Sequence, residues 1–372
     1  MNRYTIPLGR ILGIPIGLDP SWFLIFLLIT WTLAVGYYPA EFAARSPLQY
    51  WVIGALTAIL FFVSVLLHEL GHSVVALHYR IPVRSITLFI FGGVAQIAAE
   101  PPRASAEFWI AIAGPIVSFA LGVFCHLLQP LFPAGAPLLA MVKYLAFINI
   151  ALAVFNLVPG FPLDGGRVFR AIVWGVTGSF RRATITAAQF GRFFAFLFII
   201  AGVWMALSGN LVNGIWIAFI GWFLEGAAGG QLQRLQVSDI LAGHKVYEAM
   251  HRGDPIVAGD ATLQELVDQH VLGGGRRSLL IGQGDEILGL LTLHRIKAVP
   301  REEWATTTAL QAMIPRESMK WVRPDTELAA ALMDMDRDGV NQLPVMTDGR
   351  AQGVLTREDA INYLRILQEL GA

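Results

Sequence analysis

The sequence is short of cysteine and of charge, and both shortages limit what the chain can be. Cys125 is the single cysteine among 372 residues, so no disulfide can form within the chain. Only 15% of the residues are charged and 55% are hydrophobic, which is typical of a membrane protein. Basic and acidic residues both number 27. The resulting net charge of zero is an average over two unlike halves of the chain. It gives no indication of nucleic-acid binding, and nucleic acid is not expected as a partner.

The few charges are unevenly distributed. They are sparse up to about Gly230 and dense afterwards, which predicts a membrane-embedded domain over residues 1–230 and a polar region from Val237 onward. The first part holds six apolar runs near the ~20 residues that a bilayer span needs, the last two being short. They are Ser21–Tyr38, Tyr50–Leu77, Ala106–Leu128, Pro137–Leu157, Gly191–Leu207 and Leu211–Gly226. The first run is long and begins well inside the chain, which favours a retained anchor over a signal peptide.

The arginines between these runs predict the orientation of the chain. They lie before the first run, between the second and third, between the fourth and fifth, and after the sixth: Arg3, Arg10, Arg80, Arg84, Arg103, Arg167, Arg170, Arg181, Arg182 and Arg234. The alternate connections carry Arg45 alone or no arginine. Because basic loops stay on the cytoplasmic side, we expect six crossings with both termini cytoplasmic. The protein is then a multi-pass integral protein of the cell (inner) membrane.

The motif His68-Glu69-Leu70-Gly71-His72 lies at the inner end of the second run. On a helix it places two imidazoles on one face, four residues apart, where both can bind one Zn²⁺. Glu69 lies beside them, where it can take a proton from metal-bound water. A glutamate between two histidines is costly in a membrane helix unless it has a function. The motif therefore predicts zinc-dependent hydrolysis in or at the membrane, with one Zn²⁺ per chain.

A zinc site of this kind needs a third protein ligand. The second and fourth runs both cross from outside to inside, so Asp164, just past the fourth run, lies on the same side as the two histidines. Prolines and glycines surround it, and such broken backbone is tolerated at membrane depth only within protein or beside a water-lined cavity. Asp164 is the best candidate. Two other carboxylates on the inner side, Glu107 and Glu225, remain rival ligands. Two other histidines, His78 and His126, are poorly placed to join the site.

The segment Ser85–Ile97 is rich in β-forming residues and is interrupted by Gly92-Gly93, which predicts a hairpin. Its exposed edge could pair with an extended substrate, or the hairpin could only pack against the helices. Both interpretations stay open on the residues alone.

The region from Val237 onward contains an internal repeat. Two strands around a Gly-Asp turn, Ser278–Ile281 and Ile287–Thr292, recur about sixty residues later as Gln342–Met346 and Gln352–Thr356. A helical stretch precedes and follows each pair, so the repeat predicts two α/β units, residues 237–300 and 301–372.

Together these features resemble one protein family. The motif at His68–His72, the pair Gly114-Pro115 and the pattern Asn156-Leu157-x-Pro159-x-x-Pro162-x-Asp164-Gly165-Gly166 are similar to the site-2 protease family of intramembrane zinc metalloproteases. The repeat resembles a tandem pair of CBS domains, which one branch of that family carries at its C-terminus. The resemblance covers nearly the whole chain. It implies an α-helical polytopic membrane domain with a short β-hairpin, followed by an α/β CBS domain pair.

The resemblance also implies roles for individual residues. His68, His72 and Asp164 would be the zinc ligands, Glu69 the general base, and Asn156 a polar group that stabilises the oxyanion. Family members cut the transmembrane segments of membrane-anchored regulatory proteins, usually after another protease has trimmed the outer part. A transmembrane protein substrate and the lipid bilayer are therefore the expected partners.

CBS pairs often bind adenine nucleotides, with a Ser or Thr and an Asp three residues later on the ribose. Thr356 and Asp359 match this pattern, whereas Arg295 stands at the Asp position of the first repeat. The resemblance thus implies one nucleotide site that regulates the protease. The alternative is a CBS pair that serves only for docking or for homodimerisation.

Two other functions fit parts of the sequence. A CBS-regulated transporter or channel would suit six spans, but it does not need two histidines, a glutamate and an aspartate at one inner site. An inactive homologue acting as a scaffold would not need an intact Glu69.

Overall fold

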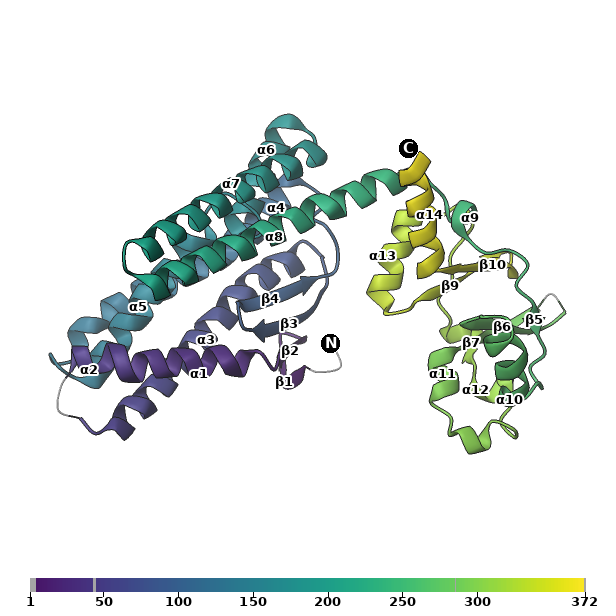
Figure 1. Cartoon of the computed structure of the whole chain (residues 1–372), viewed down its shortest axis with the longest axis horizontal. Helices are drawn as coiled ribbons and strands as arrows, with labels where there is room; N and C mark the ends of the chain where they lie inside the picture. Colours follow the sequence, from purple (N-terminus) through teal and green to yellow (C-terminus); the bar gives the residue numbers. More distant parts are fainter. Residues whose placement is uncertain (1–4, 43–44, 285, 371–372) are drawn as a thin grey trace. The chain divides into compact units, whose positions relative to one another are not determined.

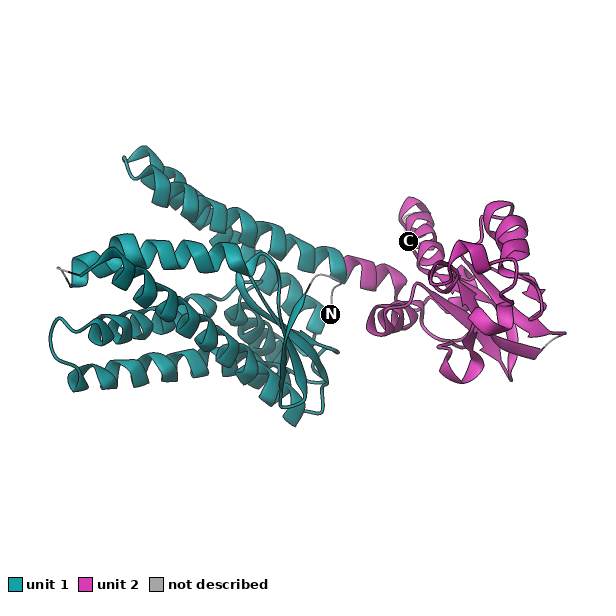
Figure 2. Cartoon of the chain, turned by 90° about the horizontal axis from the view of Figure 1, so that it is seen from below, with its two compact units in different colours: residues 1–235 teal, residues 236–372 magenta. Residues whose placement is uncertain are grey.

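The computed structural model describes residues 5–42, 45–284 and 286–370 of the chain. The chain forms two compact units, Met1–Leu235 and Gln236–Ala372, coloured separately in Figure 2. The first unit is a bundle of long helices with one small sheet, and the second is an α/β unit (Figure 1). The predicted fold class, a helical membrane domain followed by an α/β region, is therefore confirmed.

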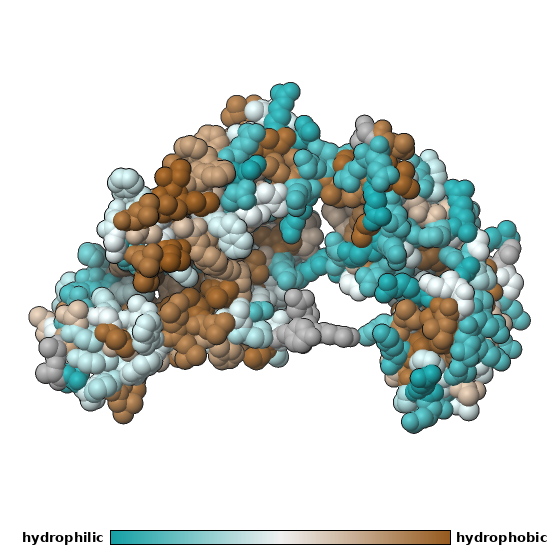
Figure 3. Space-filling view, in the orientation of Figure 1, coloured by the Kyte–Doolittle hydropathy of each residue, from teal (hydrophilic) through white to brown (hydrophobic). Residues whose placement is uncertain are grey.

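The described part of the chain contains six helical segments long and apolar enough to cross a membrane. They are Trp22–Glu41 (α1 Trp22–Thr32, η1 Leu33–Tyr37 and α2 Tyr38–Glu41), α3 Pro47–His78, α4 Ala104–Leu128 extended by η2 Gln129–Leu131, α5 Pro137–Asn156, α7 Phe180–Leu207 and α8 Leu211–Leu241. Each matches one predicted run. Many of their outward side chains are apolar and exposed, as expected of surfaces that face lipid (Figure 3).

Two of these helices are longer than their apolar runs. α7 begins at Phe180 rather than Gly191, and α8 continues to Leu241 rather than ending at Gly226. Helical hydrogen bonding does not require apolar side chains, so hydropathy reports the part of a helix that suits lipid and not its ends. Residues 229–236, between the last apolar run and the polar region, are consequently helical.

A short helix that the sequence analysis did not predict, α6 (Asp164–Thr177), follows the loop after α5. It ends at Gly178, whose φ of +67° suits a left-handed helix terminus. A Cβ on Gly165 would lie 2.4 Å from backbone atoms of Leu157 and Val158, and one on Gly166 would lie 2.3 Å from the backbone of Gly160. The glycines therefore let the first turn of α6 fold back against the loop that leads to it.

The sheet of the first unit has the order β1-β2-β3-β4: β1 Ile6–Ile11, β2 Ile14–Leu18, β3 Val83–Phe89 and β4 Gly92–Ile97. The hairpin expected over Ser85–Ile97 is confirmed as β3–β4. The β1–β2 hairpin was not predicted. Its signal is the pair Leu12-Gly13, both at positive φ (+52° and +79°), as in the two-residue turns that fit twisted strands. β4 lies at the edge of the described sheet, against α3.

The second unit contains the predicted repeat of strand pairs. β6 (Ser278–Gln283) pairs with β7 (Glu286–Thr292), and β9 (Gln342–Thr347) pairs with β10 (Arg350–Thr356). The short strands β5 (Ile256–Val257) and β8 (Ile314–Pro315) flank the first pair. The helices are α9 Val246–Ala249, α10 Leu263–Leu266 with η3 Val267–Leu272, α11 Leu293–Lys297, α12 Ala309–Ala312, α13 Leu328–Asp338 and α14 Arg357–Leu370, with single 3-10 turns at Arg301–Glu303 and Arg316–Ser318.

Segments distant in sequence share the cores of this unit. Leu241 and Val246 pack with Leu328 and Leu343 of the second repeat, whereas Met313 packs in the core of the first. A third apolar cluster joins the two strand pairs and includes Leu280, Leu290, Met346 and Val354. The two repeats are therefore packed into one body.

Candidate metal centre

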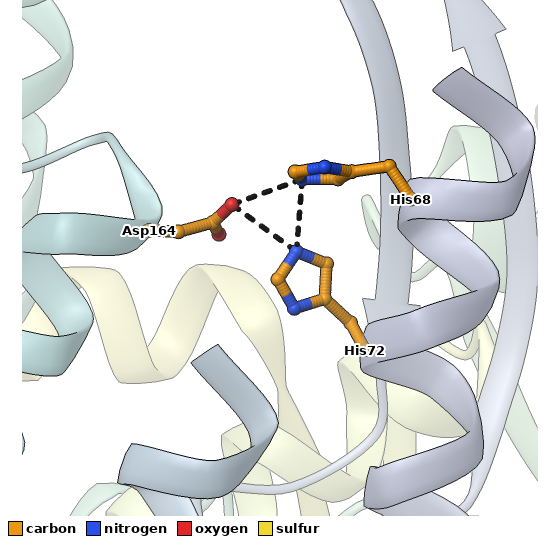
Figure 4. Close-up of side chains that lie close together, drawn as sticks. All are labelled: His68, His72 and Asp164. Atoms are coloured by element: carbon orange, nitrogen blue, oxygen red, sulfur yellow. Dashed lines mark hydrogen bonds and ion pairs between the residues drawn. The ribbon is translucent and has the colours of Figure 1, made fainter. Parts of the chain in front are cut away.

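Helices α3 and α6 bring three possible metal ligands to one point (Figure 4). The Nε2 atoms of His68 and His72, one turn apart on α3, are separated by 3.2 Å. Oδ2 of Asp164, the first residue of α6, lies 3.0 Å from Nε2 of His68 and 3.1 Å from Nε2 of His72. In the described ranges these three form the one group of at least three His, Cys, Asp or Glu side chains that could hold a metal ion.

Helix α4 fixes the orientation of both imidazoles. Nδ1 of His72 donates to the backbone carbonyl of Ile110 over 2.6 Å, and Nδ1 of His68 lies 2.8 Å from the hydroxyl oxygen of Ser118. Both rings are buried. Because each Nδ1 already has a partner, each Nε2 faces the point where the three side chains meet. Metal-binding histidines are commonly oriented in this way, by a partner bonded to the other ring nitrogen.

Gly114 leaves the space that this arrangement needs. A Cβ at this position would lie 2.2 Å from Nε2 of His72 and 2.6 Å from Nε2 of His68. Gly71 lets α3 and α4 approach each other, since its Cβ would lie 2.9 Å from Cγ2 of Val117. The glycine of the Gly114-Pro115 pair therefore forms one wall of the candidate site.

The three residues fit a zinc ion. Ligand atoms ~2.0–2.1 Å from one tetrahedral zinc lie roughly 3.3 Å from one another, and the three measured separations are 3.0–3.2 Å. Two imidazole nitrogens and one carboxylate oxygen are a donor set that zinc accepts, and a fourth position is left for water.

Glu69 lies beside this cluster and contacts strand β4. Its Oε2 accepts a hydrogen bond of 3.1 Å from the backbone N–H of Ala95. A Cβ on Gly93 would lie 2.6 Å from Cγ of Glu69, so this glycine lets the strand pass close to the carboxylate. The sequence predicts the hairpin and the glutamate separately, but the hydrogen bond between the edge strand and the glutamate is visible only in the structure.

The rival ligands have other partners. Glu107 on α4 is buried and accepts a hydrogen bond from Nε of Arg170 over 2.6 Å, and Oε1 of Glu225 lies 3.1 Å from Nε of Arg192. His78 ends α3 and His126 lies near the end of α4. None of these four joins the cluster described above.

Asn156 is the last residue of α5 and is partly buried. The backbone of the next residue, Leu157, touches the first turn of α6 through Gly165. The loop therefore returns from Asn156 to the helix that begins with Asp164.

Thr356 and Asp359 lie where β10 passes into α14. The backbone N–H and the hydroxyl of Thr356 donate to Oδ2 of Asp359 over 2.9 and 2.7 Å. Nδ1 of His251 lies 2.6 Å from the other carboxylate oxygen, and the aspartate side chain is buried. In the first repeat, Nε of Arg295 donates to the backbone carbonyl of Ala312 over 3.0 Å.

Comparisons with known proteins agree with this geometry. Over 368 residues the chain is 36% identical to sll0528 of Synechocystis sp., a candidate zinc metalloprotease, covering 98% of this chain and 96% of the relative. Peptidase family M50 matches residues 56–135 and 132–200. The chain belongs to this family.

Rip3 of Mycobacterium tuberculosis, also a candidate zinc metalloprotease, is 35% identical over 375 residues, or 98% of this chain and 94% of that protein. A solved site-2 protease from Methanocaldococcus jannaschii is 35% identical, covers 61% of this chain and 95% of its own, and aligns with a TM-score of 0.44. A CBS domain matches residues 312–366. This M50 peptidase is a zinc metalloendopeptidase of the site-2 protease type with a C-terminal CBS region, and its six apolar helices agree with an integral membrane protein. The resemblance drawn from the motifs is confirmed.

Proposed function

We propose that this M50 peptidase cleaves transmembrane segments of membrane-anchored regulatory proteins, using one Zn²⁺ held by His68, His72 and Asp164. The observation that carries the proposal is the convergence of these three side chains, within 3.2 Å of one another, at the buried face of an apolar helix. A zinc ion bound there would polarise the scissile carbonyl. It would also lower the pKa of a water molecule, which could then lose a proton and attack the carbonyl carbon.

Glu69 acts as the general base and then as the general acid. Its carboxylate accepts a proton from the attacking water as the new C–O bond forms, and it returns a proton to the leaving amine as the C–N bond breaks. Asn156 donates a hydrogen bond to the carbonyl oxygen as negative charge develops there. The close contact of Leu157 with Gly165 supports this role, because it keeps the end of α5 beside the helix that begins with Asp164.

The edge strand β4 binds the substrate in an extended form. A peptide bond in a transmembrane helix is shielded by its own helical hydrogen bonds, so the helix must unwind before cleavage. An added strand on β4 would replace those lost bonds. The contact between Ala95 and Glu69 supports this arrangement, because it places the catalytic carboxylate directly at the strand.

The CBS region binds one adenine nucleotide at Thr356 and Asp359, and the nucleotide modulates the protease. The position of both residues at a strand–helix junction supports this assignment. Asp359 is engaged by His251, so ribose hydroxyls must displace an imidazole that is itself 69% exposed. In the first repeat the Arg295 side chain is held by the carbonyl of Ala312 and offers no carboxylate. Modulation further requires that the nucleotide favour one conformation of the protease over another.

The protein lies in the cell (inner) membrane with both termini in the cytoplasm. Arginines in alternate connections support this orientation. The CBS region also mediates homodimerisation, which is supported by exposed apolar side chains on its helices, among them Met333 on α13 and Ile361 on α14.

The central test is Glu69→Gln in the purified protein, reconstituted into liposomes with a transmembrane substrate. Cleavage should fall by roughly 10²–10⁴-fold while bound zinc, measured by mass spectrometry, stays at one per chain, because the base is lost and the ligands are intact. Asp164→Ala should lower both cleavage and zinc occupancy. Glu41→Gln, in an exposed ion pair with Lys143, is the matched control and should change neither. Substantial cleavage by Glu69→Gln would remove Glu69 from this role.

The substrate can be identified with the same variant. Glu69→Gln should bind its substrate without releasing products, so a membrane protein that copurifies with this variant, and is cut by the wild-type enzyme, is the substrate. Copurifying proteins that the wild-type enzyme leaves intact would contradict the proposed substrate class.

A further inference from the structure

A buried ion pair joins the helix of Asp164 to the helix that supports the histidines. Nε and Nη2 of Arg170 on α6 both donate to Oε1 of Glu107 on α4, the first over 2.6 Å. The Arg170 side chain is 6% exposed and the Glu107 side chain is fully buried. The other carboxylate oxygen of Glu107 has no hydrogen-bond partner among the described residues. Arg170 is thus the main hydrogen-bonding partner of this carboxylate.

Arg170 is also held from both sides. Its guanidinium carbon lies 5.0 Å from the ring centre of Phe161, in the loop before α6, and 4.6 Å from that of Phe180, the first residue of α7. Arginine stacks favourably on aromatic rings, and its planar group keeps a fixed direction. The side chain therefore links α6 to α4, to the preceding loop and to α7.

Glu107 lies on the face of α4 that forms the candidate metal site. Glu107, Ile110, Gly114 and Ser118 are spaced by three, four and four residues, which places them on one side of the helix. Ile110 and Ser118 bond the two imidazoles, and Gly114 leaves room for their Nε2 atoms. The partner of Arg170 is consequently part of the same rigid surface that orients both histidines.

We propose that Glu107 and Arg170 are positioning residues, which set the place of Asp164 relative to His68 and His72. The inference rests on the proposed function, in which these three residues hold zinc. The histidines come from one helix and are fixed by α4, whereas Asp164 comes from a separate helix that begins after a loop. A directional bond between α6 and α4 removes the freedom of α6 to rotate or slide along the site.

The alternative, that the pair only stabilises the fold, explains less. Replacing a buried ion pair by apolar side chains of similar volume is often neutral or stabilising, because two charges no longer have to be stripped of water. A purely structural contact between α4 and α6 would thus work as well with two apolar side chains. Two N–H groups of one planar guanidinium, both bound to the same oxygen of Glu107, instead fix the direction of this contact.

The test compares zinc binding in the full chain, in lipid nanodiscs, between the wild type and the double variant Glu107→Met with Arg170→Met. The double variant removes both charges, so it leaves neither buried and unpaired, whereas Arg170→Met alone leaves the Glu107 carboxylate unpaired and serves as the destabilised comparison. Zinc affinity is measured by competition with a chromogenic chelator. Cobalt-substituted protein adds the visible absorption spectrum, which reports the ligand geometry.

We expect the double variant to unfold at a temperature close to that of the wild type, to bind zinc about 10-fold or more weakly, and to show an altered cobalt spectrum. Arg170→Lys keeps the charge but lacks the planar group that donates two hydrogen bonds, and it should recover part of the affinity. The exposed pair Lys143→Met with Glu41→Met is the control and should leave zinc binding unchanged.

A folded double variant with wild-type zinc affinity and an unchanged cobalt spectrum would overturn the positioning role. Failure of the wild-type protein to bind zinc would instead overturn the proposed metal site itself, so the two failures are distinguishable. If the double variant does not fold, the spectrum of Arg170→Lys decides, since an unchanged spectrum with unchanged affinity also contradicts the proposal.

Discussion

Replacing Gly114 by alanine should strongly weaken zinc binding through a single added methyl group. The added Cβ would lie 2.2 Å from Nε2 of His72 and 2.6 Å from Nε2 of His68, whereas real Cβ contacts essentially never fall under 3.0 Å. The nearer nitrogen must therefore move by at least 0.8 Å, the difference between 3.0 and 2.2 Å. Metal sites tolerate ligand displacements of only about 0.2 Å, so at least one imidazole leaves the common point.

The rings cannot move freely to restore the site. The Nδ1 bonds to the Ile110 carbonyl and to Ser118 come from the same helix that carries the new methyl group, so turning away from it breaks a buried hydrogen bond. Loss of an outer partner alone costs about 10–100-fold in metal affinity. We expect at least about 100-fold weaker zinc binding for Gly114→Ala, because a ligand is displaced as well.

The assay is zinc competition with a chromogenic chelator, together with cleavage of a transmembrane substrate in liposomes. Gly175→Ala on α6 is the matched control, since its Cβ would meet nothing closer than 3.8 Å and the substitution favours the helix. Both variants should fold. A Gly114→Ala protein that binds zinc like the wild type and cleaves normally would refute the assignment of this surface as a wall of the metal site.

Other predictions test the orientation and the second unit. Reporter fusions at Pro133 and Ala372 should report opposite sides of the membrane, and a shared side would contradict six crossings with cytoplasmic termini. In the full chain, Asp359→Ala should weaken binding of AMP or ATP about tenfold or more by calorimetry; equal affinity would separate this carboxylate from any nucleotide site. Hydrogen bonding from His244 lowers the pKa of Glu248 from 4.5 to about 2. Its contribution to stability is thus complete above about pH 4.5 and lost as the pH falls towards 2. Glu248→Gln in the fragment 236–372 should lower the melting temperature at pH 7 by a few degrees, and this difference should shrink between pH 4.5 and 2; a difference independent of pH would refute the assignment.

The candidate ligand group of His68, His72 and Asp164 could be predicted from the sequence, because the constraints on it are local or topological. Two histidines one turn apart share a helix face wherever that helix lies, and a count of crossings places Asp164 on their side of the membrane. The contacts that orient the two imidazoles could not be predicted from the sequence. The sequence spacing of Ile110 and Ser118 does not relate either residue to a histidine on another helix. Which group of α4 bonds each imidazole depends on how α3 crosses α4.

The interpretation of Glu107 shows the same limit. A buried acid in an apolar helix needs a compensating partner, and a metal ion is one such partner. Composition and topology therefore made this inner carboxylate a rival ligand. That partner is Arg170, 63 residues away on a helix that hydropathy did not reveal. α6 is short and begins among glycines that usually weaken helices, and only its packing against the preceding loop and α4 makes it form.

The sequence by itself determined the class of the protein. Long apolar runs must span lipid as helices because backbone groups there have no water to bond, arginine asymmetry predicts the orientation of those helices, and the histidine spacing fixes a shared face. Only the tertiary structure decided which groups complete the site. The carbonyl of Ile110, the space beside Gly114, the backbone N–H of Ala95 and the bond from Arg170 to Glu107 are contacts between separate elements. Such contacts depend on sub-ångström packing of helices and strands, which the order of residues along one element does not encode.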